Sequence, residues 1–489
     1  MNTRWCWVLG SIATIWSVSL PAQNGPLLYT LIDGSQLIDD CPICDRPTIA
    51  VPMRGTFELR LDQVGPLSSL YAIENIHFKA GIPNGPSYTV QGTGTYRITG
   101  EVAVTETITL EVQIDNGFTN FLCFFTNAPG SIARFWPMVR SGLDQTNGTF
   151  TQQFHLDLFA APFREIWFST GTNFKTASET ISGGDLLSSV ARTVRKNSQL
   201  TGHLGIQPVV PDLGLKDVDI LDGGEVAFSI NQDVFSETLG PLSAGDILSD
   251  QGRIIRSNQD LLIGFDPDPA GPPGFGLGAQ KLSDSGEIYF SVQTNFLSKT
   301  LAKTIHRGDL LSFAQTNVFR AGKDLLSAFK PVDADQDYGL DAVFVWPTGE
   351  IWFSTSESFV GANSISYSPG DLLSDRGYVV YRNAELLAGF GSATDPPDPG
   401  LDSLYVISDL TLPSPGAGHA QLDSPALTNQ PPQSLRLSWK GAGKYYQLEV
   451  SGEDLQSFNP ASPVTLDLSY TLPGALTNGA SQFYRLREW

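Results

Sequence analysis

The chain has 489 residues and a formal net charge of −21, and charged residues make up only 17% of it. A surface this acidic repels phosphate backbones and anionic lipid headgroups, which excludes nucleic acids and membrane surfaces as expected partners. The length predicts two to four domains, and the 48 Gly and 32 Pro residues favour short strands joined by many turns.

The first 22 residues have the pattern of a secretory signal peptide. Arg4 supplies the basic residue, an apolar run extends from Trp5 to Leu20, and Ala22 ends a site of small residues. The run is too short for a comfortable membrane span, and no later stretch of about 18 apolar residues occurs in the sequence. We therefore expect a protein that is exported, either secreted or periplasmic, with a mature chain that begins near Gln23.

Residues 26–153 are predicted to form an antiparallel β-sandwich. Apolar and polar residues alternate in three stretches, Thr56–Leu61, Gly94–Thr99 and Thr107–Ile114. Such alternation places apolar side chains on one face of a sheet and polar ones on the other. Turns rich in Gly, Pro and Asn separate the stretches, as in a compact all-β domain.

Three cysteines follow the signal peptide, and Cys41 and Cys44 form a C-x-x-C pair. In an oxidising compartment the plain interpretation is a local Cys41–Cys44 disulfide, with Cys123 buried in an apolar stretch. The alternative is a zinc site of the three Cys residues and His77, which have suitable ligand types. Redox catalysis is disfavoured, because Pro47 argues against the helix N-terminus that such a thiol needs.

Residues 154–408 carry an internal repeat with a period of about 62 residues. The segment Glu165–Ser169 returns at 225–229, 287–291 and 350–354, in steps of 60, 62 and 63 residues. A second motif, Gly-Asp-(Leu/Ile)-Leu, keeps the same spacing and begins at Gly184, Gly245, Gly308 and Gly370. A repeat of this size indicates units that bury their apolar faces against one another.

Each of the four units is predicted to contain four short strands, as in a β-propeller blade. The first strand is Leu340–Val345 in the fourth unit, and its other copies are 156–159, 215–218, 277–280 and 401–406. The fifth copy, Leu401–Val406, could complete the first blade and close the ring, or begin a degenerate fifth blade. An open β-array is the competing architecture.

The residues that recur in every unit are predicted to be structural, because a catalytic group is needed only once. They are Asp185, Asp246, Asp309 and Asp371 in the second motif, and Glu165, Glu225, Glu287 and Glu350 in the first. An Asp after Gly can accept backbone N–H groups of its own turn. Trp167, Tyr289 and Trp352 share one repeat position, which we assign to the core between units, with a sugar-stacking platform as the alternative.

The strongest metal signal is the loop 333–341. Asp333, Asp335, Asp337 and Asp341 lie at every second position or close to it, and several carboxylates on one loop can supply the oxygen ligands that Ca²⁺ prefers. The loop is not an EF-hand, because its glycine comes one place late and no Glu follows at the twelfth position. The alternative is a solvated acidic turn before a strand. Weaker versions of the signal lie at Asp266 and Asp268, and at Asp395, Asp398 and Asp402.

Residues 409–432 are predicted to be a linker, because Pro and Gly leave little to pack there. Alternating stretches at 435–439, 445–450 and 483–486 then predict a small β-domain over 433–489, similar to a fibronectin type III domain. It is shorter than the roughly 100 residues of a full sandwich of that type.

The repeat resembles those of secreted, propeller-like bacterial proteins whose functions are mostly unassigned. The resemblance lies in Leu340–Val345, Gly349–Thr355 and Gly370–Leu373, and the segment Cys41–Thr48 and the Phe-Tyr-Arg-Leu ending are similar to parts of the same kind of protein. These motifs are structural, so the resemblance implies no catalytic residue. The copies also differ, since the Leu-Asp pair is Leu-Lys at 215–216 and Leu-Gly at 277–278.

The sequence favours a secreted, non-enzymatic protein that binds or scaffolds a glycan or an extracellular protein. Repetition without a single chemical constellation supports this hypothesis, and neither an H-E-x-x-H nor a G-x-S-x-G motif occurs. The alternative is a hydrolase or lyase acting on extracellular polysaccharide, with its site in the central channel of a propeller. A non-repeating cluster of carboxylates or His at that channel would favour the enzyme.

Overall fold

The computed structural model describes residues 13–15, 26–82, 84–100, 104–133, 136–177, 179–268, 275–283, 286–391, 398–411, 414, 417–418, 420–423, 426–428, 434–451, 458–473 and 482–489. The protein is all-β, with 50% of residues in strands and 7% in helices. It divides into two compact bodies. The first comprises residues 24–164 and 407–410, and the second comprises 1–23, 165–406 and 411–489.

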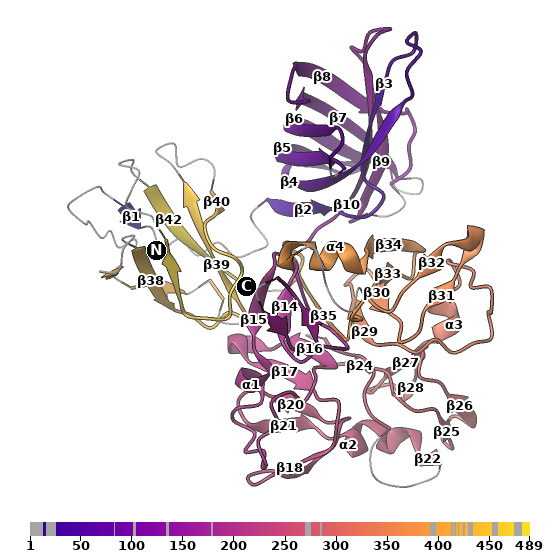
Figure 1. The fold of residues 1–489 in the computed structure, drawn as a ribbon, viewed down its shortest axis with the longest axis vertical. Helices are drawn as coiled ribbons and strands as arrows, with labels where there is room; N and C mark the ends of the chain where they lie inside the picture. Colours follow the sequence, from indigo (N-terminus) through magenta and orange to yellow (C-terminus); the bar gives the residue numbers. More distant parts are fainter. Residues whose placement is uncertain are drawn as a thin grey trace. The chain divides into compact units, whose positions relative to one another are not determined.

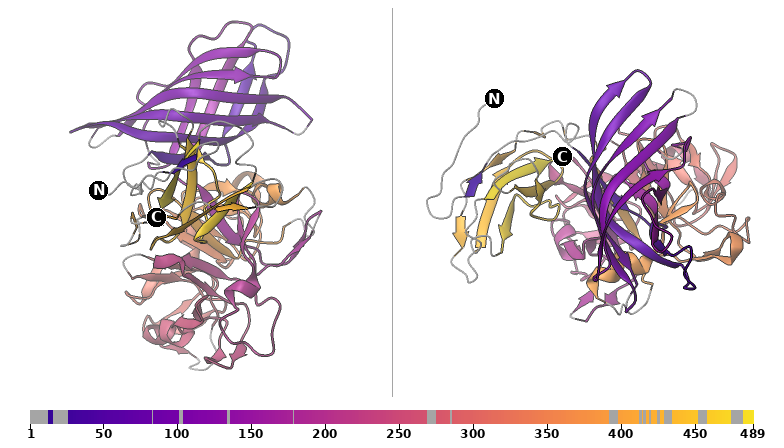
Figure 2. Two further views of the ribbon diagram at one scale, coloured as in Figure 1. Left: turned by 90° about the vertical axis from the view of Figure 1, so that its left-hand side faces the viewer. Right: turned by 90° about the horizontal axis from the view of Figure 1, so that it is seen from above.

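The first body is built on one nine-stranded antiparallel sheet that closes on itself (Figures 1 and 2). Closure occurs at β10, which pairs with β9 on one side and with β3 on the other. β2 pairs with both β10 and β4. The strands are β2 (Leu27–Leu31), β3 (Gln36–Asp40), β4 (Ile49–Gly65), β5 (Ser68–Gly81), β6 (Ser87–Thr99), β7 (Thr105–Asp115), β8 (Asn120–Asn127), β9 (Val139–Gln145) and β10 (Gln153–Ala161).

The closed sheet replaces the expected sandwich of two facing sheets. The alternation was predicted correctly, since β7 alternates buried and exposed residues along its whole length, and its buried face joins a single core with Tyr29, Phe57 and Phe125. A sheet with one apolar face can bury it against a second sheet or by closing into a barrel, and closure requires that its strands bend strongly. Gly55 and Gly92 allow it, because a Cβ there would lie 2.0 and 2.1 Å from a carbonyl oxygen of the neighbouring strand.

A segment distant in sequence completes this body. The guanidinium of Arg164 lies 2.8 Å from the Asp409 carboxylate, and both side chains are almost fully buried. The second oxygen of Asp409 accepts the N–H of Leu28 at 3.0 Å. Residues 407–410, which were expected to end the repeats and begin the linker, therefore belong to the core of the first body.

The second body contains four four-stranded antiparallel sheets, one for each repeat (Figure 1). The first consists of β15 (Arg192–Arg195), β14 (Leu186–Ser188), β11 (Glu165–Ser169) and β35 (Ser403–Ile407). The second consists of β16 (Asp217–Ile220), β17 (Val226–Ser229), β20 (Ile247–Ser249) and β21 (Arg253–Arg256). The third consists of β23 (Gln280–Leu282), β24 (Ile288–Phe290), β27 (Leu310–Ser312) and β28 (Asn317–Arg320), and the fourth of β29 (Ala342–Val345), β30 (Ile351–Ser354), β33 (Leu372–Ser374) and β34 (Tyr378–Tyr381).

The first sheet takes its first strand from the far end of the repeat region. Residues 156–159, predicted to be that strand, lie in β10 of the closed sheet, and β35 takes the place beside β11. Both segments have the same Leu-Asp pattern, so their sequences do not distinguish them. The partner of β11 is chosen by which edge is available, because β10 is already paired on both sides.

In three of the four units the Ser that ends the first motif bonds the next sheet, whereas Ser229 bonds Asp217 of its own sheet. Ser169 donates to the carbonyl of Leu215 at 2.6 Å, Ser291 to Leu340 at 3.1 Å, and Ser354 to Leu401 at 2.7 Å. Leu401 precedes β35, which belongs to the first sheet, so the series of sheets returns to its start. A closed four-bladed propeller stays our interpretation of this series.

Short helices and small hairpins complete the units. Each unit has one helix after its fourth strand: α1 (Asn197–Leu200), α2 (Asn258–Leu262), α3 (Gly322–Leu325) and α4 (Asn383–Leu387). The hairpins are β12 (Phe174–Lys175) with β13 (Thr180–Ile181), β18 (Val234–Ser236) with β19 (Gly240–Leu242), β25 (Phe296–Ser298) with β26 (Lys303–Ile305) and β22 (Pro267–Asp268), and β31 (Phe359–Val360) with β32 (Ser366–Tyr367). Among the described parts of the chain, every helix is too short or too polar to cross a membrane.

The C-terminal segment forms two small sheets within the second body. One contains β1 (Ala13–Ile15), β42 (Gln482–Glu488), β39 (Tyr446–Ser451) and β40 (Asn459–Pro460), and the other contains β36 (Gln421–Leu422), β38 (Ser434–Lys440), β37 (Ala426–Thr428) and β41 (Ser469–Leu472). Apart from β1, the expected signal peptide lies outside the described residues. The likeness to fibronectin type III stays a prediction.

The first repeat unit holds the C-terminal segment through its recurring Glu. Glu165 accepts the N–H of Val464 at 2.8 Å, and Arg192 donates to the carbonyl of the same residue. Tyr445 packs edge-on against Trp167, with 6.1 Å between ring centroids. A residue that is structural in every unit thus has an additional role in one of them.

Candidate functional site

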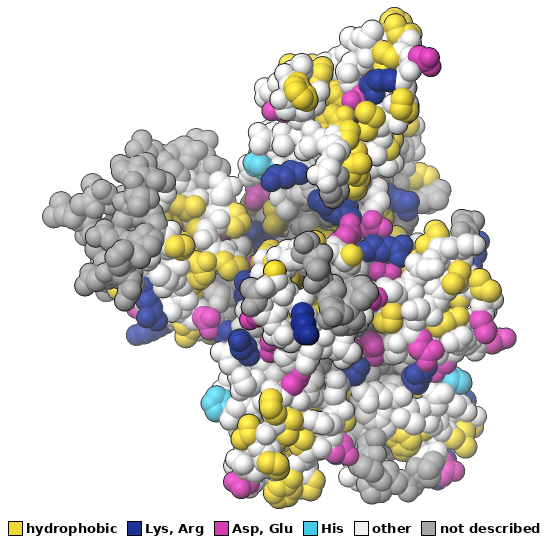
Figure 3. All heavy atoms as spheres, in the orientation of Figure 1, with side chains coloured by type: hydrophobic (Ala, Val, Ile, Leu, Met, Phe, Trp, Pro, Cys, Tyr) yellow, Lys and Arg dark blue, Asp and Glu magenta, His cyan; other side chains and the backbone are white. Residues whose placement is uncertain are grey.

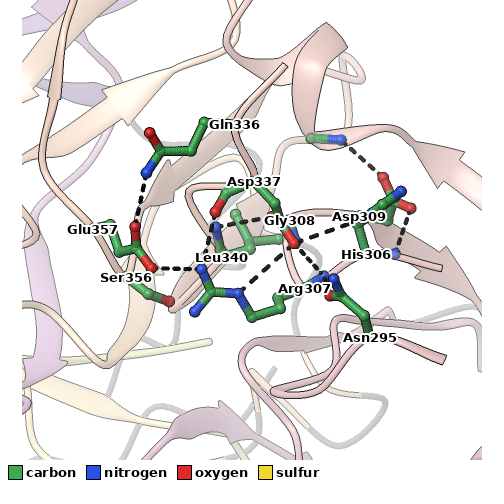
Figure 4. A network of polar contacts seen from close by, with 12 residues as sticks. Asn295, His306, Arg307, Gly308, Asp309, Gln336, Asp337, Leu340, Ser356 and Glu357 are labelled. Atoms are coloured by element: carbon green, nitrogen blue, oxygen red, sulfur yellow. Dashed lines mark hydrogen bonds and ion pairs between the residues drawn. The ribbon is translucent and has the colours of Figure 1, made fainter. Parts of the chain in front are cut away.

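A pocket of about 280 Å³ lies at the third repeat unit. Its walls are the segment 303–309, the start of α3, and the loop 334–340, while Leu325, Leu340 and Phe353 supply apolar surface. The polar network beside it is drawn in Figure 4. Exposed charged side chains of both signs, Lys303, Lys323 and Asp335, line the opening.

The recurring Asp of each unit holds two segments of backbone together. One carboxylate oxygen accepts the N–H of the residue that begins the unit's short helix, at 2.8 Å from Asn197, 2.8 Å from Asn258, 3.0 Å from Gly322 and 3.1 Å from Asn383. In three units the other oxygen accepts an N–H of the Asp's own turn. The aspartates at 185, 246, 309 and 371 are therefore structural in every unit, whatever else one of them does.

The recurring Glu of each unit is also structural, because it bonds a neighbouring strand of its own sheet. It accepts a hydrogen bond from the Ser that ends the third strand, at 2.7 Å from Ser188, 3.0 Å from Ser312 and 2.7 Å from Ser374, and Ser249 bonds Glu225 likewise. In two units it also accepts the indole N–H of Trp167 or Trp352. Both indoles are fully buried, which leaves no face on which a sugar could stack.

Arg307 organises one wall of the pocket. Its guanidinium donates to Glu357 at 2.6 Å and to the carbonyl of Asp337 at 2.9 Å (Figure 4). A hydrogen bond from Arg307 lowers the pKa of Glu357, and the same bond raises the pKa of Arg307. Gln336 donates to the other oxygen of Glu357 at 3.0 Å. These bonds fix the loop that carries the predicted calcium ligands.

The structure does not bring the four predicted calcium ligands together. Asp337 accepts the N–H groups of Gly308 at 2.9 Å and Gly339 at 3.1 Å. Asp341 pairs with Lys216 at 3.4 Å, and Asp333 accepts the N–H of Asp335 at 3.3 Å. Within the described ranges, no group of three or more His, Cys, Asp or Glu residues could hold a metal ion.

The reason is that Asp337 belongs to a turn that the repeat uses elsewhere. Asp212 accepts the N–H of Gly214 at 2.8 Å and Asp398 that of Gly400 at 3.0 Å, as Asp337 does with Gly339. Each of these glycines has a positive φ, which favours glycine. The geometry therefore favours the acidic turn that was the alternative. Of the weaker signals, Asp268 pairs with Lys299 at 3.5 Å, and Asp395 lies outside the described residues.

We expect millimolar Ca²⁺ to leave the melting temperature unchanged relative to a chelator, because Asp337 and Asp341 already have donors and cations as partners. Thermal unfolding in about 5 mM CaCl₂ and in EGTA checks this expectation, because a site whose Kd is a hundredfold lower would be stabilised by about 2.7 kcal/mol. A rise that disappears in an Asp335→Ala, Asp337→Ala variant would reinstate the calcium site.

A second cluster of charges lies where the first strands of the units meet. Lys216 lies 3.0 Å from Asp402 and 3.4 Å from Asp341, and all three side chains are largely buried. Burial and the nearby Asp341 raise the pKa of Asp402 to about 6 although Lys216 lowers it, and burial raises that of Asp217 well above its usual value. The cluster does not repeat, since Gly278 occupies the equivalent position in the third unit.

These shifts predict a protein that gains stability on mild acidification. A carboxyl whose pKa is higher in the folded state takes up its proton there first, so folding is favoured below that pKa and loses this contribution as the pH rises through it. For Asp402 the window is about pH 4 to 6, and the effect is on the order of 3 kcal/mol. Urea unfolding across this window should show a smaller pH dependence for Asp402→Asn than for the wild type. Equal slopes would show that Asp402 does not titrate there.

The cysteines are arranged for structure. Cys41 and Cys44 form a disulfide with 5.3 Å between their Cα atoms. Cys123 is a fully buried free thiol, and burial raises its pKa to about 11. His77, the fourth ligand of the alternative zinc site, bonds the carbonyl of Asn75 through Nδ1. The disulfide uses two of the ligands that zinc would need.

The residues that distinguish the units received no role from the sequence, because recurrence was taken as the signal. The departure at Lys216 was noted, whereas those at Ala321 and Gly322 were missed. Lys216 stands where Asp341 and Asp402 stand in other copies, and Ala321 and Gly322 stand where the fourth unit has Arg382 and Asn383. The signal for them is the set of positions at which one unit differs from the other three.

No family model matches the chain, and no curated protein matches it. Among solved structures, the extracellular domain of BT4673, a two-component-system protein of B. thetaiotaomicron, is similar at 8% identity with a TM-score of 0.21, covering 99% of this chain and 79% of that one. A second structure of that domain has a TM-score of 0.20. PorZ, a surface component of the type IX secretion system of Porphyromonas gingivalis, has 8% identity and a TM-score of 0.20, covering 98% of this chain and 82% of its own. These likenesses are too weak to carry an argument.

Proposed function

We propose that this is an exported, non-enzymatic binding protein of the extracellular space or periplasm, with a glycan or another extracellular protein as its partner. The observation that carries the proposal is the use of the recurring polar groups. The repeated Asp and Glu residues bond backbone and neighbouring strands within their own units. What the repeat provides is a scaffold, and the pocket arises where one unit departs from it.

Two further observations support export. The first 22 residues have a basic residue, a short apolar run and a small-residue site. The Cys41–Cys44 disulfide suits an oxidising compartment. We likewise propose the domain order of signal peptide, closed sheet, four-bladed propeller and small C-terminal β-domain.

The experiment is a comparison of binding with turnover on the exported protein. The purified mature chain is screened against a glycan array and against extracellular proteins, and the same preparation is incubated with extracellular polysaccharides while reducing ends and unsaturated products are measured. Saturable binding without turnover supports the proposal. Catalytic release of products would replace it with the enzyme.

One observation favours that second candidate, a polysaccharide hydrolase or lyase. Asp341 and Asp402 form a non-repeating carboxylate pair, and a carboxyl pKa near 6 suits a general acid. Lys216 pairs with both carboxylates, and only 4% of the Asp402 side chain is exposed, so a substrate would have to displace an ion pair. If turnover is found, loss of it in Asp402→Asn with folding retained would assign it to this pair.

A further inference from the structure

The fourth repeat unit shows what can occupy the space that forms the pocket in the third. Arg382, just before α4, donates to the Asp371 carboxylate at 2.7 Å and to the carbonyl of Ser366 at 3.1 Å. Its guanidinium lies over the ring of Tyr367, 5.2 Å from the centroid. Beside it, the amide of Asn383 donates to the carbonyl of Gly370 at 3.3 Å.

The third unit has the same acceptors without these side chains. Thr304 and Asp309 correspond to Ser366 and Asp371, while Ala321 and Gly322 replace Arg382 and Asn383. Asp309 is held as Asp371 is, accepting the N–H groups of His306 and Gly322 at 3.0 Å each. In the part of the chain that the structure describes, no cationic side chain pairs with it. The third-unit residues named here line the pocket: Thr304, His306, Asp309, Ala321 and Gly322.

The first and second units show which of the two replacements matters. Lys196 stands at the position of Arg382 in the first unit, and its charge partly offsets the burial that raises the pKa of Asp185. In the second unit that position is Ser257, but Asn258 is kept and donates to the carbonyl of Gly245 at 3.3 Å. Only the third unit lacks both the cation and the amide.

We propose that the third-unit pocket binds the guanidinium group of an arginine side chain from an extracellular partner protein, in the place that Arg382 fills in the fourth unit. This inference rests on the proposed binding function and names its partner. A guanidinium can donate to the Asp309 carboxylate and to the Thr304 carbonyl together, because its N–H groups form a planar fork. Leu325 and Phe353 in the pocket wall suit the aliphatic stem.

The charges around the pocket allow a cation to enter. Asp309, Asp335 and Asp337 line the pocket, as do Lys303, Lys323 and His306, and Arg307 pairs with Asp337 at 3.7 Å. The two lysines and His306 are exposed, so solvent screens them. On the face in Figure 3, acidic and basic side chains are interspersed, and the net charge of −21 attracts cationic partners at long range.

The test is calorimetric titration of the full-length mature chain with N-acetyl-arginine-amide and with N-acetyl-citrulline-amide, which has the same shape without the charge. We expect one site that prefers the arginine compound at least tenfold. Equal binding of the two compounds, or no binding of the arginine compound, would overturn the inference. If glycans or proteins still bind in the screen above, the binding function survives and only this assignment fails. Tighter binding of free arginine than of the capped compound would overturn the choice of a protein partner.

Two variants place the site. Ala321→Arg supplies the side chain that fills the equivalent space in the fourth unit, so it should reduce binding of the arginine compound at least tenfold. Ala321→Met fills the space without a charge and should also reduce binding at least tenfold. It serves as the test if the Ala321→Arg protein does not fold. Ser257→Arg is the matched control in the second unit and should leave binding unchanged. Full binding by both folded Ala321 variants would rule this pocket out.

Discussion

Replacing Phe290 with Ala should lower the free energy of unfolding of the repeat region by about 3–5 kcal/mol. Phe290 lies on β24 and is fully buried. It packs edge-on against Phe265, with 6.0 Å between ring centroids, in a cluster that also contains Leu277 and Leu311. Removing the ring loses the free energy gained by burying it, and it leaves a cavity that the surrounding short strands can only partly fill.

The same position recurs in each unit as Phe168, Phe228 and Phe353, and each is fully buried. Because one unit packs on the next, the loss should appear as a lower melting temperature of the repeat region as a whole. Phe235→Ala is the matched control, because 56% of the Phe235 side chain is exposed in the same region. A Phe290→Ala protein that melts with the wild type would show that the position is not part of the core.

Replacing Glu488 with Ala should unfold the C-terminal domain or weaken it by about 3 kcal/mol or more, because buried backbone donors would lose their acceptor. The Glu488 carboxylate is fully buried. One oxygen accepts the N–H groups of Gly418 and Ala420, and the other accepts those of Ala442 and Gly443, at 2.8–3.0 Å. One side chain thereby joins three segments of the chain.

Glycine makes this arrangement possible, since a Cβ at Gly443 would lie 2.4 Å from the Glu488 side chain. Hydrogen exchange of peptides covering β39 and β42 measures the effect on this domain separately from the repeats. Asp467→Ala serves as the control, because its side chain is 59% exposed. Unchanged protection in Glu488→Ala would mean that water replaces the carboxylate at little cost.

The repeat was predictable because two sequence motifs recur at the same interval of about 62 residues. The motif that begins at Glu165 lies on the second strand of each sheet, and the motif that begins at Gly308 leads into the third. The structural roles of the recurring Asp and Glu also followed from their recurrence. The calcium interpretation of loop 333–341 stays a prediction that the geometry disfavours, because Asp337 accepts a glycine N–H of its own turn as Asp212 and Asp398 do in other units.

The sequence by itself determined the all-β class, the period, the four units and the burial of the aromatic positions, because these depend on local alternation and spacing. Tertiary structure decided the rest. Which Leu-Asp strand completes the first sheet depended on an edge left open by another strand, and closure of the N-terminal sheet depended on how far its strands bend. The pocket at Asp309 exists because one unit has Ala and Gly where the fourth unit has Arg and Asn. The sequence shows this difference, but only the positions of the neighbouring residues show that it leaves a pocket.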